Sequence, residues 1–270
     1  MFTTGVIFSA FPVTSASLMT RTLLLRGMLV GLIAGLFVFA FARWAGEPSV
    51  DKAIAFETSM DQAKGEAPEP EMVSRKIQKS IGLLTGTVVY STALGGIFGL
   101  VFAFVRGRLS LARPRVLAAW LALLGFIAIV LVPSLKYPAN PPSVGNPETI
   151  GVRTGAYFLL IVISLSAMML AIQMGRHWSK SLGSWNASLL SALLFLLLVG
   201  VTSHFLPHID EVPMGFPASL LWKFRIASWE TQVVLWSTLG LFFGWLTERN
   251  ESLSQIPGQS SRPMEEMRYS

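Results

Sequence analysis

Histidine and carboxylate side chains gather in one short segment, which carries His204, His208, Asp210 and Glu211. Imidazole and carboxylate ligands together suit a borderline divalent metal such as Co²⁺, Ni²⁺ or Zn²⁺. Pro207, however, interrupts the helical spacing between the two histidines. A second interpretation is equally good, in which His204 caps the end of a helix and His208 lies in solvent.

A second group of carboxylates follows the first long apolar run and consists of Glu47, Asp51 and Glu57. Pro48 is expected to set a turn here. On a helix, Asp51 and Glu57 would not face each other, so a metal ion shared between them would need ligands from elsewhere in the chain. The competing interpretation is a solvated charged helix, which the sequence alone favours.

A third segment, at residues 135–150, holds four prolines, which exclude a regular helix. Extended backbone at membrane depth is tolerated where it lines a cavity, and its bare carbonyls with Asn140 could replace water around a cation. The segment could equally be a rigid spacer, although a spacer has no need of Lys136 and Tyr137 at the bilayer edge.

Six apolar runs must position these side chains. Hydrophobic residues make up 52% of the 270 residues, charged residues only 13%, and the mean hydropathy is +0.57, so water is not the main solvent of this chain. A helix needs about 20 residues to cross a hydrocarbon core, and backbone amides in lipid must bond within a helix. The sequence therefore predicts an all-α polytopic membrane protein with about six transmembrane helices, at residues 23–41, 81–105, 116–135, 154–175, 187–205 and 231–247.

Basic residues in the short loops predict the orientation, because Lys and Arg are retained on the cytoplasmic side. Residues 106–115 hold four arginines and no acid, and residues 176–180 hold Arg176 and Lys180 without an acid. We expect these two loops and both termini on the cytoplasmic side. The connections expected on the non-cytoplasmic side are residues 42–80, 136–153 and 206–230.

The membrane domain is expected to span residues 21–249. Residues 1–20 lack the basic start and continuous apolar region of a secretory signal, and are expected to be an N-terminal extension, with Met19 a natural alternative start. Residues 250–270 are expected to form a disordered cytoplasmic tail. Pro217 is expected to start a short amphipathic helix that lies in the membrane interface before the last span.

Glycines recur at every fourth position in the first two spans, where small residues let two helix backbones approach closely. This spacing predicts helix contact faces at Gly27, Gly31 and Gly35, at Gly82 and Gly86, and at Gly95 and Gly99.

Several functions are excluded by what the sequence lacks. The chain has no cysteine, which rules out disulfides, thiolate metal sites and thiol nucleophiles. Its formal net charge of +6 is spread over short loops beside apolar runs rather than over one basic face, which indicates phospholipid head groups and not nucleic acid. There is no Gly-rich Lys-Ser/Thr phosphate loop for a nucleotide, and no His-Glu-x-x-His motif or nucleophile constellation for hydrolysis. We therefore expect a protein that is not an enzyme and carries no cofactor.

Three loop motifs make the chain resemble the CbtA family of predicted cobalt transporter subunits. They are Glu47-Pro48 with Val50-Asp51 and Ala53-Ile54 up to Glu57, then Lys136 to Pro142 through Gly145, Thr149 and Arg153, then Glu211-Val212-Pro213 with Gly215-Phe216-Pro217 and Leu221-Trp222 to Arg225. The resemblance runs from about Thr22 to Arg249. It implies a multi-pass protein of the bacterial inner membrane that imports cobalt for corrinoid synthesis beside a small, single-span, histidine-rich subunit of the CbtB type.

The resemblance also ranks the candidate ligands. As metal ligands it favours Glu47, Asp51, Glu57, Glu211 and Asn140. Three further residues rank lower: His204 and His208 lie outside the family pattern, and Asp210 carries less weight as a ligand. The basic residues at motif positions are expected to brace the loops by pairing with acids, and they are Lys136, Arg153 and Arg225.

The resulting hypothesis is that the three non-cytoplasmic connections fold together over the helix bundle. They would form an oxygen-rich access site for a hydrated divalent cation, which the membrane potential draws inward. Two alternatives remain open: a non-transporting scaffold for a metal-binding partner, and a membrane-embedded enzyme of corrinoid or lipid metabolism that uses Glu or Asp as general acid or base.

Overall fold

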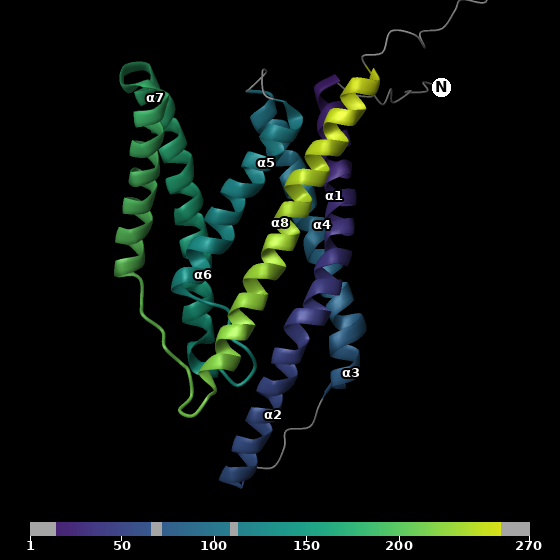
Figure 1. Cartoon of the computed structure of the whole chain (residues 1–270), viewed down its shortest axis with the longest axis vertical. Coiled ribbons are helices and arrows are strands. Elements are labelled where there is room, and N and C mark those ends of the chain that lie inside the picture. The colour runs from purple at the N-terminus through teal and green to yellow at the C-terminus, as the bar shows by residue number, and fades with distance from the viewer. Residues whose placement is uncertain (1–14, 66–71, 109–112, 255–270) are drawn as a thin grey trace, which may run out of the picture.

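The computed structural model describes residues 15–65, 72–108 and 113–254. These ranges contain helices and no strand, which confirms the all-α prediction for the described part of the chain. In chain order the helices are α1 (Ser15–Phe41), α2 (Glu47–Lys64), α3 (Arg75–Ile77), α4 (Leu83–Arg106), α5 (Pro114–Gly125), α6 (Val132–Lys136), α7 (Ile150–Phe205) and α8 (Ala218–Ser254) (Figure 1). Short segments of other helix types join or precede them. Three are π-helical, namely η1 (Ala42–Gly46), η2 (Gln78–Gly82) and η3 (Phe126–Leu131), and one is a 3-10 helix, η4 (Pro147–Thr149).

Among the residues that the structure describes, four helical stretches are long and apolar enough to cross a membrane, judged by length and composition. They are Leu18–Lys64, Arg75–Arg106, Pro114–Lys136 and Pro147–Phe205. All six predicted apolar runs lie within helices, but two of them share α7 and the last belongs to α8, which is not among the four stretches. Gly183 breaks the helical conformation of α7 with φ 74° and ψ 162°. Figure 1 shows the two arms of α7 lying side by side, joined by a turn at one end.

Two of the predicted glycine faces, that of Gly27, Gly31 and Gly35 in α1 and that of Gly95 and Gly99 in α4, are confirmed as helix contacts, and they pack against each other. A Cβ added to Gly27 would lie 2.1 Å from the carbonyl oxygen of Gly95, and one added to Gly99 would lie 2.4 Å from that of Leu23. Gly31 and Gly35 meet the backbone of α4 at similarly short distances. The two backbones are therefore in direct contact, which side chains at these positions would prevent.

The second predicted glycine face, at Gly82 and Gly86, is not a helix contact. No atom lies within 4 Å of a Cβ added to Gly86, and a Cβ on Gly82 would meet only the carbonyl of Ile77 in its own helical stretch, at 3.4 Å. Spacing alone does not reveal which face of a helix a partner covers. Here α1 packs against a different face of α4, along Thr87, Ser91, Gly95 and Gly99.

The core has two main parts. Buried side chains of α1, α4, α5 and α8 form the larger one, in which Phe243 packs edge-on against Phe98 and Phe102 at ring distances of 5.4 and 5.0 Å. The smaller part joins α6 to both arms of α7 around Leu160 and Phe195. α7 therefore stands beside the other helices as a hairpin of its own (Figure 1).

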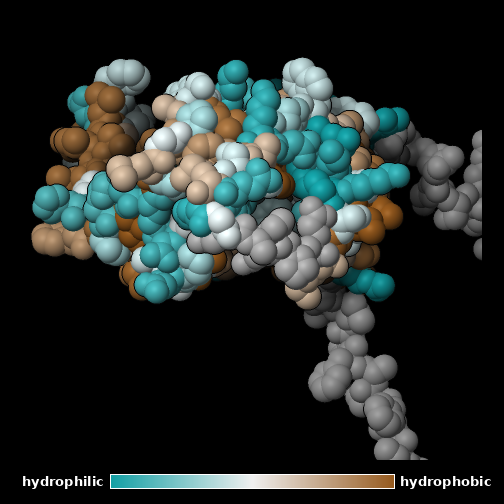
Figure 2. All heavy atoms as spheres, turned by 90° about the horizontal axis from the view of Figure 1, so that it is seen from below, coloured by the Kyte–Doolittle hydropathy of each residue, from teal (hydrophilic) through white to brown (hydrophobic). Residues whose placement is uncertain are grey.

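The connections between helices separate to the two ends of the molecule (Figure 1). At one end, which we call the α2 end, lie α2, α3, the proline-rich segment before α7 and the segment before α8. The opposite end, the Gly183 end, carries the turn of α7 and the last turns of α8. Figure 2 views the molecule from the α2 end, where hydrophilic residues spread across the surface and hydrophobic residues lie around the flanks.

Ion pairs fasten α8 to two other helices at the Gly183 end. Arg106 of α4 contacts Glu251 at 2.7 Å, and Arg115 of α5 contacts Glu248 at 3.1 Å. Because α8 runs from the α2 end to this end, these contacts fix its far end against the bundle.

Several predicted boundaries are corrected by the helices. Residues 42–80 are not mainly a loop, because α1 passes through η1 into α2 and the α4 stretch begins at Arg75. The prediction of a separate interfacial helix after Pro217 is wrong, because α8 runs unbroken from Ala218 to Ser254. α8 thus includes the start of the predicted tail, and α1 begins at Ser15 inside the predicted N-terminal extension. Residues 1–14 and 255–270, the remainder of these two predictions, lie outside the described residues.

Candidate functional site

Two predicted carboxylates meet two basic side chains at the α2 end, in a group that we call the Arg75 cluster. Glu47 and Asp51 are one turn apart on α2, and Arg75 and Lys79 are one turn apart at the start of the α4 stretch. Arg75 Nε donates to Asp51 Oδ1 at 3.0 Å and its Nη2 donates to Glu47, while Lys79 Nζ lies 3.3 Å from Asp51 Oδ2. Glu47 is buried, so its charge depends on Arg75 for compensation.

Glu211 ties the third connection to the second one. It accepts hydrogen bonds from Arg153 Nη1 at 2.7 Å, from the backbone N–H of Asn146 at 3.0 Å and from the Thr149 hydroxyl. The Thr149 hydrogen bond, the Asn146 N–H and the charge of Arg153 together hold the pKa of Glu211 below its ordinary value. Gly145 completes this Glu211 cluster, because it has φ 138° and a Cβ there would lie 2.8 Å from Arg153 Nη1.

Asn140 is placed by the last helix. Its Oδ1 accepts a hydrogen bond from Arg225 Nη2 at 3.0 Å, and one turn further along α8 the indole N–H of Trp229 donates to Ser134 Oγ at 2.9 Å. The Tyr137 hydroxyl donates to the carbonyl of Pro207 at 2.9 Å. The proline-rich segment is therefore an ordered loop, bonded to both α8 and the third connection.

Residues 204–211, which carry the two predicted histidine ligands, do not form a set of metal ligands. His204, His208 and Asp210 are exposed, and the ring of His204 lies edge-on to Phe205 at the end of α7. Within residues 15–65, 72–108 and 113–254, no group of three or more His, Cys, Asp or Glu side chains is placed so that it could hold a metal ion. The structure brings Glu47 and Asp51 together and leaves Glu211 and Asn140 in separate groups, with Lys136 at the end of α6.

A cleft of about 480 Å³ opens between these groups and is called here the α2 cleft. One wall is α2, which contributes Phe56, Glu57, Met60, Asp61 and Lys64, and the other is the proline-rich segment with Arg153 and Pro213. Glu57 and Asp61 are one turn apart and so share this face of α2. Phe56 packs edge-on against Phe216 at 5.1 Å, which joins the α2 wall to the third connection.

The whole membrane region of the chain corresponds to one known family. The family model of CbtA, described as a probable cobalt transporter subunit, matches residues 20–248. The chain belongs to the CbtA family. No curated protein and no solved structure matches it. Together with the long apolar helices, membership makes this CbtA chain a multi-pass membrane protein in a lipid bilayer, and its description as a subunit implies a partner subunit.

Sequence reasoning missed the partners of the acids in this CbtA chain. Arg75 and Lys79 follow Asp51 by 24 and 28 residues, and no local pattern connects them to it. Thr149 was recognised only as part of a motif, and nothing in its spacing pointed to Glu211, 62 residues away. Asp61 could have been found from the sequence. It lies four residues after Glu57, so on the helix that was considered for this segment the two carboxylates share one face.

Replacing Glu211 by Gln is expected to destabilise the protein in a pH-dependent way. The folded-state pKa of Glu211 lies below its ordinary value of 4.5, so its ionised form stabilises the fold above that pH, and this contribution disappears as the pH falls through the folded pKa. The melting temperatures of wild type and Glu211→Gln in detergent should therefore differ at about pH 7 and converge towards about pH 3. A difference that is constant over this range would contradict the assignment of the shift to Glu211.

Proposed function

We propose that this CbtA chain is the membrane subunit of a cobalt importer of the bacterial inner membrane, supplying corrinoid synthesis. The family match supports cobalt transport, and the observation that carries the proposal further is the α2 cleft. All three family motifs of the connections meet at the α2 end, and the first two of them, with Pro213 of the third, line this cleft. Three segments that are distant in the sequence therefore share one cleft at the α2 end.

The proposed topology has six crossings and both termini in the cytoplasm. Gly183 divides α7 into two antiparallel arms, each containing one predicted span, and α8 contains the sixth. The end of α4 with Arg106, the start of α5 with Arg115 and the turn of α7 lie at the Gly183 end, which the retention of Lys and Arg assigns to the cytoplasm. The α2 end then faces outward.

Glu57 and Asp61 are the residues proposed to attract the ion. The cleft of about 480 Å³ has room for a cation with six waters, which occupy about 180 Å³ at about 30 Å³ each. A divalent ion about 6 Å from one carboxylate in water gains about 1.4 kcal/mol, or about tenfold in affinity. Glu57 and Asp61 are chosen because they line the α2 cleft. Glu47, Asp51 and Glu211 do not line it and are assigned to bracing the loops through their ion pairs.

Uptake is proposed to need no nucleotide. A membrane potential of 100 mV, negative inside, favours the entry of two positive charges by about 4.6 kcal/mol, at about 2.3 kcal/mol for each. The partner is proposed to be a small single-span subunit of the CbtB type whose histidines deliver cobalt. The chain itself is proposed to be neither an enzyme nor the carrier of a resident cofactor.

Cells that lack their own importers test the proposal when they express this chain with its partner. Uptake of radioactive cobalt should exceed that of the empty vector, and Glu57→Gln with Asp61→Asn should lower it about tenfold or more at low cobalt and low ionic strength. Glu148→Gln is the matched control, since Glu148 is an exposed acid at the same end and does not line the cleft. The proposal fails if wild type at normal membrane levels takes up no cobalt.

The scaffold function is a second candidate, favoured by the pairing of the motif carboxylates with Arg75, Lys79 and Arg153. On that account the chain only positions its metal-binding partner. Uptake would then require the chain but would be unaffected by Glu57→Gln with Asp61→Asn, which separates the two functions in the same experiment.

A further inference from the structure

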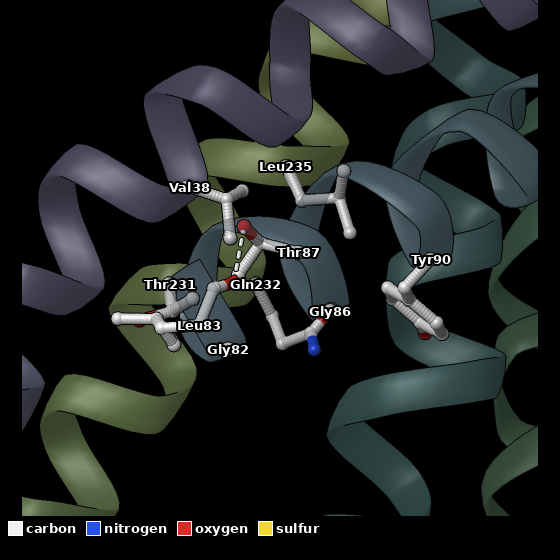
Figure 3. A pocket seen from close by; sticks show the side chains of 9 residues that line it. All are labelled: Val38, Gly82, Leu83, Gly86, Thr87, Tyr90, Thr231, Gln232 and Leu235. Atoms are coloured by element: carbon white, nitrogen blue, oxygen red, sulfur yellow. Dashed lines mark hydrogen bonds between the residues drawn. The ribbon is translucent and has the colours of Figure 1, made fainter. Parts of the chain in front are cut away.

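A groove of about 340 Å³ lies between α1, α4 and α8 and is called here the Gly86 groove. Its lining residues are Val38 of α1, Gly82, Leu83, Gly86, Thr87 and Tyr90 of the α4 stretch, and Thr231, Gln232 and Leu235 of α8 (Figure 3). The groove exists because no side chain fills it at Gly86, where an added Cβ would have no atom within 4 Å. Gly95, on another face of the same helix, touches the backbone of α1 instead.

The lining of the Gly86 groove is uncharged and mostly apolar. None of its residues is Lys, Arg, His, Asp or Glu. The hydroxyls of Thr87 and Thr231 each donate to the backbone carbonyl four residues earlier, at 2.9 and 2.7 Å, so both donors are used within their own helices. The other polar side chains are those of Gln232 and Tyr90. At membrane depth, a lining of this kind suits a hydrocarbon chain.

The groove opens toward lipid along one side of the α4 stretch. Gly82, Gly86 and Tyr90 follow one another at every fourth position on this side, and all three are exposed (Figure 3). The eight residues from Gly82 to Tyr90 rise about 12 Å, at about 1.5 Å for each residue. One leaflet of a hydrocarbon core is about 15 Å deep, half of about 30 Å. An acyl chain in the groove would therefore contact protein over most of the depth of its leaflet.

Trp44 marks the level of the membrane interface at this end. Its side chain is 76% exposed in η1, and exposed tryptophan gathers at the level of the lipid head groups. α1 and α4 run antiparallel, with Gly35 against Val88. Trp44 lies nine residues after Gly35 and Lys79 lies nine residues before Val88, so the two side chains start at about the same depth. Lys79 is therefore at head-group level, and the Gly86 groove begins about one helical turn below it.

One positive charge stays unbalanced at this level. Arg75, Lys76 and Lys79 lie within five residues of the chain, and Arg75 and Lys79 pair with Glu47 and Asp51. Lys76 is exposed and makes no ion pair with any residue that the structure describes. Three basic side chains thus meet two acidic ones. A lysine at the membrane surface favours an anionic lipid by about fivefold.

We propose that the Gly86 groove binds an anionic glycerophospholipid, with one acyl chain in the groove and the phosphate held by Lys76 beside Arg75 and Lys79. The apolar lining holds the chain and the unbalanced charge selects the head group. The lipid fills the space that α1, α4 and α8 leave beside Gly86, and it joins these helices to the Arg75 cluster. This site goes beyond the proposed import of cobalt and does not depend on which ion the protein transports.

Melting temperatures of the purified full chain test the site when lipid is added back. The protein would be kept in detergent and freed of copurified lipid. Phosphatidylglycerol should raise the melting temperature, and phosphatidylcholine with the same acyl chains should need a concentration about fivefold higher or more for half of that rise. Glycerol phosphate, which has the anionic group and no acyl chain, should have no effect.

Two variants address the two parts of the site. Lys76→Met should raise the half-maximal concentration of phosphatidylglycerol about fivefold and leave the melting temperature without lipid unchanged. Its control is Lys52→Met, an exposed lysine of α2 that lies eight residues, about 12 Å, beyond Trp44. Gly86→Leu should abolish the effect of both lipids, because the new side chain occupies the groove. Its control is Gly200→Leu on α7, which does not line the groove and also has no atom within 4 Å of an added Cβ.

Each outcome decides one part of the proposal. Equal half-maximal concentrations for the two lipids, or for Lys76→Met and Lys52→Met, would overturn the selection of an anionic head group. A rise with glycerol phosphate alone would show a phosphate site without a lipid chain. A full lipid effect in Gly86→Leu would overturn the groove, and loss of the partner subunit from that variant would assign the groove to a partner helix. If Gly86→Leu does not accumulate, the two head groups and Lys76→Met decide. None of these results depends on cobalt uptake.

Discussion

Gly95→Ala is expected to prevent the protein from accumulating in a folded form. The new Cβ would lie 2.2 Å from the carbonyl oxygen of Gly27 and 2.8 Å from Gly31 Cα, distances that real Cβ atoms do not show. Both atoms belong to the backbone of α1, so relief requires the two helices to separate along their contact. We expect a loss of about 3 kcal/mol or more, at the upper end of the range for overpacking.

Membrane levels and detergent melting temperatures measure this effect, with Gly86→Ala as the matched control on the same helix. No atom lies within 4 Å of an added Cβ at Gly86, and Ala is the better helix former, so the control should be as stable as wild type or slightly more so. Equal melting temperatures for Gly95→Ala and wild type would show that α1 and α4 do not pack as described.

Arg75→Met is expected to have the second largest effect on stability. It leaves the buried carboxylate of Glu47 without a counter-charge and removes one of the two basic partners of Asp51. Breaking a buried pair from one side costs about 3 kcal/mol, since the remaining charge stays desolvated. The melting temperature and the urea midpoint of the purified protein should both fall.

A double variant separates lost charge from lost packing. Glu47→Gln combined with Arg75→Met removes both charges and should recover part of the stability that Arg75→Met loses, whereas Lys76→Met, an exposed neighbour, should change little. If the double variant is less stable than Arg75→Met, Glu47 and Arg75 do not form the pair that holds α2 against the α4 stretch.

The helices were predictable from composition because lipid forces a backbone to satisfy its own hydrogen bonds. The ends of the helices were not. Pro48 was interpreted as a turn, yet the helical stretch Leu18–Lys64 continues through it. The π-helical turn η1 lies directly before it, and such a wider turn accommodates a proline that has no N–H to donate. Pro217 was interpreted correctly as a helix start, but nothing in the following residues showed that α8 would run through to the last span.

The candidate site was predictable in its location and not in its contacts. The motifs placed chemistry in three connections, and the structure gathers those connections at one end. Residue types do not reveal long-range partners, so Glu47, Asp51 and Glu211 were interpreted as ligands before Arg75, Lys79 and Arg153 were seen to pair with them. Spacing likewise found both glycine faces of α4, but only packing shows that one is covered and the other open.

Cobalt flux into proteoliposomes tests the central claim most directly. Vesicles would contain this CbtA chain with its partner subunit, or the partner alone, and a potassium gradient with valinomycin would set the potential. The account predicts that radioactive cobalt accumulates only when both subunits are present, and that accumulation rises with an interior-negative potential, as two transported charges require. Absence of accumulation with both subunits correctly inserted, or equal accumulation with the partner alone, would contradict the assignment of this chain as the membrane subunit of a cobalt importer.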